Sequence, residues 1–141
     1  MGNSHSYTIY CDGGARGNPG PAAYGFVIYD EHGSKIYEEG RVIGNATNNV
    51  AEYTGVVAAL KWFATKNQEP RSKIQIFLDS KLVAEQLSGR WKIKNENLRN
   101  LFFTIKELEQ KIGAIFSYSN LPREQNQEAD RLVNLALDGK L

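Results

Sequence analysis

The sequence has few of the features that mark secreted, membrane-spanning or strongly charged proteins. It contains one cysteine, Cys11, and no signal-peptide pattern, so we expect no internal disulfide and a reducing, cytoplasmic setting. No apolar run approaches the roughly 20 residues of a membrane span, so no membrane association is expected. Seventeen basic residues nearly balance sixteen acidic ones, which argues against a polybasic coat but not against a local basic groove.

What the chain does contain is enough apolar material for one folded unit. Its 141 residues are 41% hydrophobic, which fits a single domain over residues 7–141. Residues 1–6 are expected to be a disordered N-terminal segment. The sequence shows no internal repeat, linker or low-complexity stretch that would divide the domain further.

The strongest helix pattern covers residues 48–63. Apolar residues recur there with the three-then-four spacing of a buried helical stripe. Glu52 lies in the first turn, about a quarter turn from the centre of that stripe. It has a structural explanation, because Asn49 and Glu52 resemble a capping box and the helix dipole favours an acid there. Alternatively, the carboxylate points toward a site beside the start of the helix.

Alternating apolar residues and turn residues predict the other elements. Strands are expected at residues 7–12, 23–30, 35–43, 74–78 and 114–119. Helices are expected after Ser80, from about residue 98 to 112, and over residues 126–138. This order predicts an α/β fold with a mixed five-stranded sheet: the first three strands form an antiparallel meander, strands one, four and five are parallel, and helices cover both faces.

Four of these segments carry an acid at what should be the same edge of the sheet. Asp12 and Asp79 end the first and fourth strands, whereas Glu52 and Asp130 lie in first turns of helices. Each acid alone could be a strand terminator or a dipole-favoured residue. Together they would repel one another unless a hard divalent cation such as Mg²⁺ or Mn²⁺ compensates them. Four carboxylates can hold two ions about 4 Å apart, the spacing used to cleave phosphodiesters.

The stretch GGARGNPGP after Asp12 has two explanations. It could be an ordinary turn, or a loop whose backbone N–H groups approach a phosphate. Its spacing matches neither a Walker loop nor a dinucleotide fingerprint, so the pattern does not indicate a nucleotide site.

Four stretches together resemble a known family. The segments YCDGGARGNPG, TNNVAEY, LDSKLVAEQL and NQEAD are similar, in order and spacing, to the four motifs of the type 1 ribonuclease H family. The resemblance covers residues 7–138. It implies a ribonuclease H-like fold and hydrolysis of the RNA strand of RNA–DNA hybrids to 5′-phosphate and 3′-hydroxyl ends. It also implies two Mg²⁺ ions, replaceable by Mn²⁺. A monomer is expected, without a sequence feature that determines it.

The resemblance assigns the ion ligands to the four acids. Asp12 would bridge both ions, and Asp130 would complete the site of the ion that activates water. Glu52 and Asp79 would hold the ion that stabilises the leaving 3′-oxygen.

The resemblance also implies contacts to both nucleic-acid strands. The backbone of residues 13–15, that is Gly13, Gly14 and Ala15, would contact RNA 2′-hydroxyls together with Asn48. Thr47 and Asn18 would face a phosphate of the DNA strand. A helix cap and a turn residue are their structural explanations, and both can hold together with the phosphate contact. Further implied substrate contacts come from Ser80, Trp91, Lys92, Lys94, Arg123 and Asn126.

The sequence departs from many bacterial members in two places, both in the manner of short, archaeal-like members. Residues 88–97 replace a long basic protrusion, so Trp91 and the two lysines after it would have to contact the DNA strand. Alternatively, Trp91 anchors this turn to the core. The family's histidine before the last Asp is absent, and Glu124, less so Arg123, is expected to serve in its place as a catalytic group. A solvated turn is the alternative for that loop.

Three functions remain open from the sequence. The first is a hybrid-specific endoribonuclease, with double-stranded RNA as a further substrate, as in some archaeal-like members. The second is a hybrid-binding module without activity, against which the intact set of four acids argues. The third is another enzyme on a similar fold, such as a DNA-strand transferase or an exonuclease.

Overall fold

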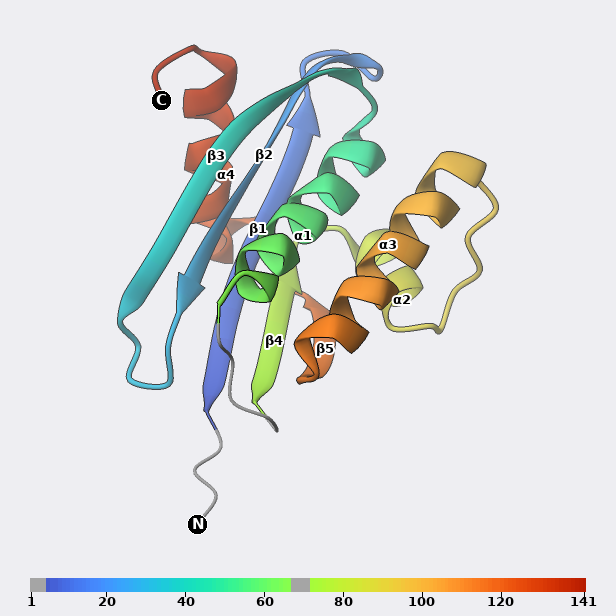
Figure 1. The fold of residues 1–141 in the computed structure, drawn as a ribbon. Coiled ribbons are helices and arrows are strands. Elements are labelled where there is room, and N and C mark those ends of the chain that lie inside the picture. The colour runs from blue at the N-terminus through green and yellow to red at the C-terminus, as the bar shows by residue number, and fades with distance from the viewer. Residues whose placement is uncertain (1–4, 67–71) are drawn as a thin grey trace.

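The structure, a computed structural model, describes residues 5–66 and 72–141. A five-stranded sheet with strand order β3-β2-β1-β4-β5 forms its centre (Figure 1). The strands β1 (Ser6–Ala15), β2 (Gly20–Tyr29) and β3 (Lys35–Ala46) form an antiparallel meander. The strands β4 (Lys73–Leu78) and β5 (Ile115–Asn120) run parallel to β1. The mixed sheet predicted from the sequence is therefore confirmed.

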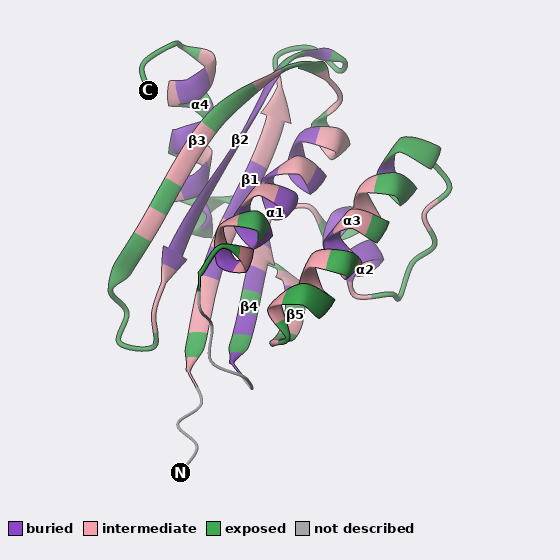
Figure 2. Ribbon diagram, viewed as in Figure 1, coloured by how far each residue is buried: buried purple, intermediate pink, exposed green. Residues whose placement is uncertain are grey.

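The helices cover the two faces of the sheet unequally (Figure 1). One face carries α1 (Asn48–Ala64), α2 (Lys81–Leu87) and α3 (Glu96–Ile112), which enclose the larger apolar core. The other face carries α4 (Gln127–Leu137), which covers a small cluster around Ala23 and Val133. Buried residues follow β2, β4 and the inner sides of the helices (Figure 2).

Three helices on the larger face begin at a side-chain cap. Thr47 accepts from Val50 N, Ser80 from Val83 N and Asn95 from Leu98 N, each at 3.0–3.2 Å. These caps satisfy backbone N–H groups that a helix start leaves unpaired. Helix α3 therefore starts two residues earlier than its apolar pattern predicts, and it ends at Gly113, whose φ of 78° suits glycine.

Two local predictions are wrong. Glu52 is not part of a capping box, because Thr47 caps α1 and the Glu52 carboxylate binds elsewhere. The glycine-rich stretch is not a turn throughout, since β1 continues to Ala15, which pairs with Ala22 of β2. Glycine permits a turn but does not force one, and pairing with β2 decides the outcome here.

The predicted disorder of residues 1–4 and the predicted break at Pro70 lie outside the described residues. Ser6 already belongs to β1, and the ring of His5 contacts Glu31 at 2.9 Å. Within residues 5–66 and 72–141, no helix is long and apolar enough to cross a membrane.

Candidate metal centre and nucleic-acid face

Four acids meet in a cavity of about 350 Å³ at the carboxyl ends of β1 and β4. Asp12 comes from β1, Asp79 from the residue after β4, and Asp130 from the start of α4. Glu52 comes from α1 but lies beyond the first turn, where the sequence places it, because the helix already begins at Asn48. The convergence predicted from the sequence is thus present, because the parallel pairing of β1 with β4 stops at Tyr10 and Phe77, just before Asp12 and Asp79, and two helices begin at the same edge.

Three of the acids are tightly grouped. Asp12, Glu52 and Asp79 each offer an oxygen, and these atoms lie within 4.8 Å of one another. Asp12 is 6% exposed and Glu52 is 4% exposed. Asp130 lines the same cavity from α4 but stands outside that close group, and Asn134 Nδ2 donates to its Oδ2 at 3.4 Å.

Burial and mutual repulsion keep protons on this cluster. Burial raises the pKa of Asp12 to about 7, with further increases from Asp79 and Asp130 and an opposing decrease from the contact with Glu52. Burial, followed by Asp12, raises the pKa of Glu52 well above its usual range, against a hydrogen bond from Gly13. Burial also raises the pKa of Asp79, although the Arg123 guanidinium opposes it. At neutral pH the cluster without metal therefore retains a proton.

The residues present fit a hard divalent cation. Glu52 Oε2 and Asp79 Oδ2 are buried and have no hydrogen-bond partner within the part of the chain that the structure describes. Such atoms are costly unless a ligand or proton compensates them. Carboxylate oxygens without histidine or thiolate are the donors that Mg²⁺ and Mn²⁺ prefer.

The end of β1 is tied to the first turns of α1. Gly13 N donates to Glu52 Oε1 at 3.1 Å, and Ala15 N donates to Asn48 Oδ1 at 2.8 Å. A Cβ on Gly13 would lie 2.3 Å from the backbone carbon of Ala51, so only glycine allows this approach. The predicted RNA-contacting residues 13–15 and Asn48 therefore do line the cavity.

The residues predicted to face a DNA phosphate lie beside this junction. Asn18 Oδ1 accepts from Asn48 N at 2.9 Å, and Thr47 caps α1. The structural explanations of both residues are thus correct, and a phosphate contact would come in addition to them.

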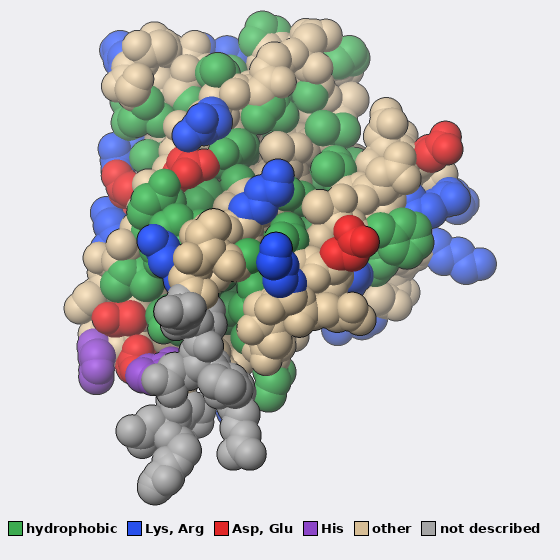
Figure 3. All heavy atoms as spheres, in the orientation of Figure 1, with side chains coloured by type: hydrophobic (Ala, Val, Ile, Leu, Met, Phe, Trp, Pro, Cys, Tyr) green, Lys and Arg blue, Asp and Glu red, His purple; other side chains and the backbone are tan. Residues whose placement is uncertain are grey.

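The segment between α2 and α3 is held by its backbone while its side chains face outward. Buried Gln86 accepts from Tyr53 at 2.6 Å and donates to the carbonyl of Lys92 at 3.2 Å. Trp91 is 44% exposed, with the Lys81 ammonium 5.9 Å from its ring centroid. Trp91 therefore does not anchor the turn to the core. Lys92 and Lys94 are exposed. Figure 3 shows basic side chains projecting from this edge of the molecule.

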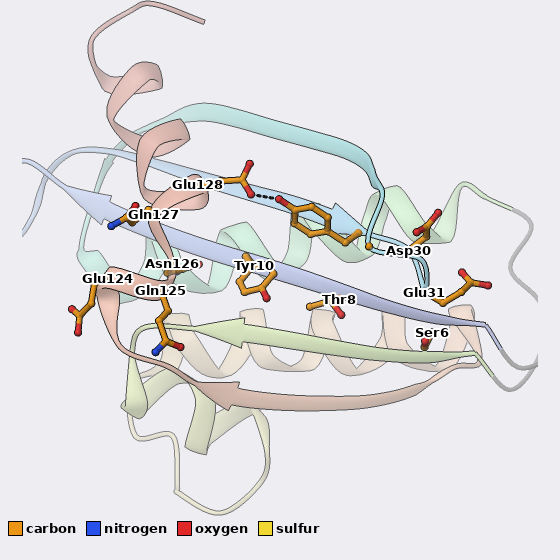
Figure 4. A pocket seen from close by; sticks show the side chains of 12 residues that line it. Ser6, Thr8, Tyr10, Asp30, Glu31, Glu124, Gln125, Asn126, Gln127 and Glu128 are labelled. Atoms are coloured by element: carbon orange, nitrogen blue, oxygen red, sulfur yellow. Dashed lines mark hydrogen bonds between the residues drawn. The ribbon is translucent and has the colours of Figure 1, made fainter.

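The loop before α4 divides its residues between two cavities. It contains a short 3₁₀ turn, η1 (Arg123–Gln125). Arg123 Nε lies 3.6 Å from Asp79 Oδ2 and lines the carboxylate cavity. Glu124 and Asn126 instead line a second cavity of about 600 Å³ beside β1 (Figure 4). The structure thus places Arg123 beside the acids, whereas the sequence favours Glu124 over Arg123 as the catalytic group of this loop.

Asn126 also differs from the prediction. Its side chain is 1% exposed and donates to the carbonyl of Cys11 at 2.8 Å, so it is not available to a substrate in the carboxylate cavity. Ser80, in contrast, lines that cavity. Arg16, which is not among the residues predicted from the sequence, lines the cavity and binds Asp138 at 2.7 Å. A cation inside a glycine-rich stretch next to Asp12 was the available indication.

The comparisons agree with this geometry. The family described as "Reverse transcriptase-like" matches residues 10–136. Ribonuclease HI of Halobacterium salinarum is 41% identical over 129 residues, covering 92% of this chain and 63% of the relative. The bifunctional protein Rv2228c of Mycobacterium tuberculosis is 44% identical over 135 residues, covering 92% of this chain and 35% of the relative. The chain therefore spans about a third of the length of Rv2228c and under two thirds of the halobacterial protein.

Solved structures match over nearly the whole chain. LC11-RNase H1, isolated from compost and solved with an RNA/DNA hybrid, is 38% identical with a TM-score of 0.90, covering 94% of this chain and 97% of that one. The N-terminal RNase H domain of Rv2228c is 41% identical with a TM-score of 0.87, covering 97% and 96%. The fold and the acidic edge of the sheet define a ribonuclease H-like α/β protein. Within the reverse transcriptase-like family, the chain belongs to the type 1 ribonucleases H.

Proposed function

We propose that this chain is a metal-dependent endoribonuclease that hydrolyses the RNA strand of RNA–DNA hybrids. The observation that carries the proposal is the convergence of four carboxylates, from four separate elements, in one cavity. The relatives named ribonuclease HI and the similar structure that holds an RNA/DNA hybrid support this substrate.

The four acids would hold two Mg²⁺ ions, with Mn²⁺ as a substitute. Asp12 interacts with each of the other three acids, so we assign it as the shared ligand. Glu52 and Asp79 would complete one ion site, and Asp130 the other. When bound, such ions supply an activated water and stabilise the charge on the phosphate and the leaving oxygen. Water would lose a proton to solvent and form the new bond to phosphorus while the bond to the 3′-oxygen breaks. The leaving oxygen would take up a proton from solvent, which gives 5′-phosphate and 3′-hydroxyl ends.

The wall beside Asp12 would distinguish RNA from DNA. Gly13 and Ala15 use their N–H groups to bind α1, whereas Asn48 is exposed at the mouth of the cavity. We assign contacts to 2′-hydroxyls to Asn48 and to the backbone of residues 13–15, including Gly14. Ser80, at the start of α2, would contact the same strand beside Asp79.

The DNA strand would lie along Asn18, Thr47 and the segment before α3. The exposed indole of Trp91 offers a face for a deoxyribose, where a 2′-hydroxyl would obstruct packing. Lys92 and Lys94 would pair with phosphates. Gln86 holds the backbone of this segment through the carbonyl of Lys92. Binding of the duplex would therefore cost little backbone entropy here, because the segment is already ordered.

The 3₁₀ turn before α4 would assist turnover through Arg123, which faces Asp79. The catalytic contribution predicted for Glu124 would then be small. The monomeric state, the single domain and the cytoplasmic location stay predictions.

A cleavage assay with matched duplexes tests the proposal. RNA–DNA, RNA–RNA and DNA–DNA duplexes of one sequence, each strand labelled in turn, would be incubated with Mg²⁺, Mn²⁺ or EDTA. We expect cleavage of the RNA strand of the hybrid, dependent on metal, with 5′-phosphate ends. Binding of the hybrid without cleavage would instead favour the inactive binding module, and cutting of a DNA strand would favour another enzyme of this fold. The RNA–RNA duplex decides whether double-stranded RNA is a further substrate.

A further inference from the structure

Asp130 reaches the cavity by a different route from the other three acids. It comes from α4, which lies on the opposite face of the sheet from α1 (Figure 1). Its distance from Asp12 therefore depends on how α4 is seated on β1 and β2. An error of about 1 Å in such a seat is enough to impair a reaction that requires exact placement.

The first contact that fixes the position of α4 on the sheet is made by the buried side chain of Asn126. Its Nδ2 donates to the carbonyl of Cys11 at 2.8 Å, in the peptide unit immediately before Asp12. Its own carbonyl accepts from Asp130 N at 3.1 Å, the first hydrogen bond of the helix around that acid. One residue thus joins the backbone next to Asp12 with the backbone of Asp130.

Because its side chain binds β1, Asn126 does not cap helix α4. Asparagine at a helix N-cap normally accepts from an N–H group of the first turn, which stabilises the helix by about 1 kcal/mol. Here Asn126 occupies the cap position of α4, yet its side chain makes no capping hydrogen bond and binds β1 instead. Helices α1, α2 and α3 all keep a side-chain cap. The exception falls on the helix that carries Asp130.

The second contact is the close approach of α4 to Gly25. Gly25 is the residue of β2 that pairs directly with Asp12. A Cβ at this position would lie 2.7 Å from the carbonyl oxygen of Ala129, the residue before Asp130, and 2.7 Å from Leu132 Cβ. Any side chain here would push the start of α4 away from the sheet at the level of Asp12.

A third contact holds the outer side of the same turn. The hydroxyl of Tyr29 on β2 donates to the Glu128 carboxylate, which also binds Lys35 at 2.9 Å. Figure 4 shows Glu128, which lines the second cavity, turned toward this tyrosine. The start of α4 is thus attached to β1 and to β2 at separate points.

We infer that Asn126 and Gly25 are positioning residues that fix Asp130 relative to Asp12 and so determine metal binding at the shared site. The inference rests on the proposed function for its effect on turnover. Its effect on metal binding is independent of any activity. Partners that orient metal ligands in this way typically contribute 10- to 100-fold in metal affinity or rate.

Two variants and one control test the inference. Asn126→Leu keeps the branching of the side chain and removes its polar atoms, whereas Gly25→Ala removes no hydrogen bond and displaces the helix. The control, Ile105→Ala, lies in the core of α3 on the other face and lowers stability without touching α4. Each protein would be checked for folding by circular dichroism. Calorimetric titration with Mn²⁺ would be done without nucleic acid, and steady-state cleavage of a hybrid would follow.

We expect both variants to bind Mn²⁺ about 10- to 100-fold more weakly and to lose kcat by a similar factor, while KM for the hybrid changes less than about threefold. Ile105→Ala should keep both the metal affinity and kcat. The inference is overturned if both single variants, Asn126→Leu and Gly25→Ala, fold and bind Mn²⁺ with wild-type affinity. It is also overturned if Ile105→Ala loses as much Mn²⁺ affinity as they do. If one variant fails to fold, the other decides. If the wild type binds Mn²⁺ but cleaves no hybrid, the proposed function fails and the titration alone decides the positioning.

Discussion

The two cavities on either side of η1 differ in a way that volume does not reveal. The second cavity is larger, about 600 Å³ against about 350 Å³. Three of its acids have partners, since Asp30 accepts from two backbone N–H groups, Glu31 binds His5, and Glu128 binds Tyr29 and Lys35. In the smaller cavity, two buried carboxylate oxygens have no hydrogen-bond partner among the described residues.

The physical lesson is that uncompensated charge indicates a site better than empty space does. Hydrogen bonds and cations lower the pKa of Glu31 and Glu128, so the ionised form of these acids is stabilised. Burial and neighbouring acids raise the pKa of Asp12 and Glu52 instead. A group held in an unfavourable state persists in a fold when a ligand compensates it.

The largest expected effect separates the two cavities by activity. Asp12→Asn should lower hybrid cleavage at least 100-fold, because a lost metal ligand should cost more than the 10- to 100-fold of an outer partner. The matched change Glu31→Gln, at the rim of the second cavity, should leave the rate unchanged. Initial rates at saturating hybrid with Mg²⁺ measure both. Cleavage by Asp12→Asn at the wild-type rate would mean that the metal assignment is wrong.

The next effect concerns stability without metal and has opposite signs in the two cavities. The pKa of Asp12 is about 7 in the folded protein and about 3.9 in an unfolded chain, so the folded state binds the proton more tightly. The resulting stabilisation is complete below pH 4 and is lost as the pH rises through 7, with a slope of at most about 1.4 kcal/mol per pH unit. In EDTA at pH 8, Asp12→Asn should therefore raise the free energy of unfolding by roughly 1–3 kcal/mol.

Glu128→Gln provides the opposite case. The Tyr29 hydroxyl, then Lys35, lower the pKa of Glu128, so its stabilisation is present above the unfolded pKa and is lost as the pH falls. Because the carboxylate is partly exposed, the substitution should lower the free energy of unfolding by no more than about 1 kcal/mol. Urea unfolding between pH 4 and 8 measures both variants. If Glu128→Gln raised the free energy of unfolding, or Asp12→Asn lowered it, the predicted opposite signs for the two cavities would be wrong.

A smaller effect locates the duplex on the side of the carboxylate cavity. Each lost phosphate contact should reduce the slope of log affinity against log salt by about 0.9 on B-form DNA, and by a similar amount on a hybrid. Lys92→Ala with Lys94→Ala should thus flatten the salt dependence while kcat stays the same. Trp91→Ala should weaken binding at every salt concentration. The control replaces Lys73 and Lys111, exposed at the far ends of β4 and α3. An equal change of the salt slope in that control would mean that Lys92 and Lys94 are not the phosphate contacts.

The smallest effect compares neighbours that face different cavities. Arg123 lies beside Asp79, whereas Glu124 lines the second cavity. Arg123→Ala should lower kcat several-fold, about 1 kcal/mol in activation free energy, and Glu124→Ala should lower it less than twofold. Single-turnover and steady-state rates on a hybrid would measure both. A larger loss in Glu124→Ala would restore the role that the sequence predicts for it.

The sequence by itself determined the framework of this protein. Alternating apolar residues, helical stripes and the caps Ser80 and Gly113 specify the elements, because these patterns are local and act through the period of the backbone. Four acids at strand ends and helix starts also predicted the cluster of carboxylates, since topology brings such positions to one edge.

Only the tertiary structure decided how the remaining residues are used. Whether Glu52 caps its own helix or binds Gly13, whether Gly13 turns or continues β1, and whether Asn126 caps α4 or reaches Cys11 are choices between partners far apart in the chain. The local alternatives differ by about 1 kcal/mol, so packing between α1, β1 and α4 outweighs them. The sides to which Arg123 and Glu124 turn follow from the same packing, because a 3₁₀ turn points successive side chains in different directions.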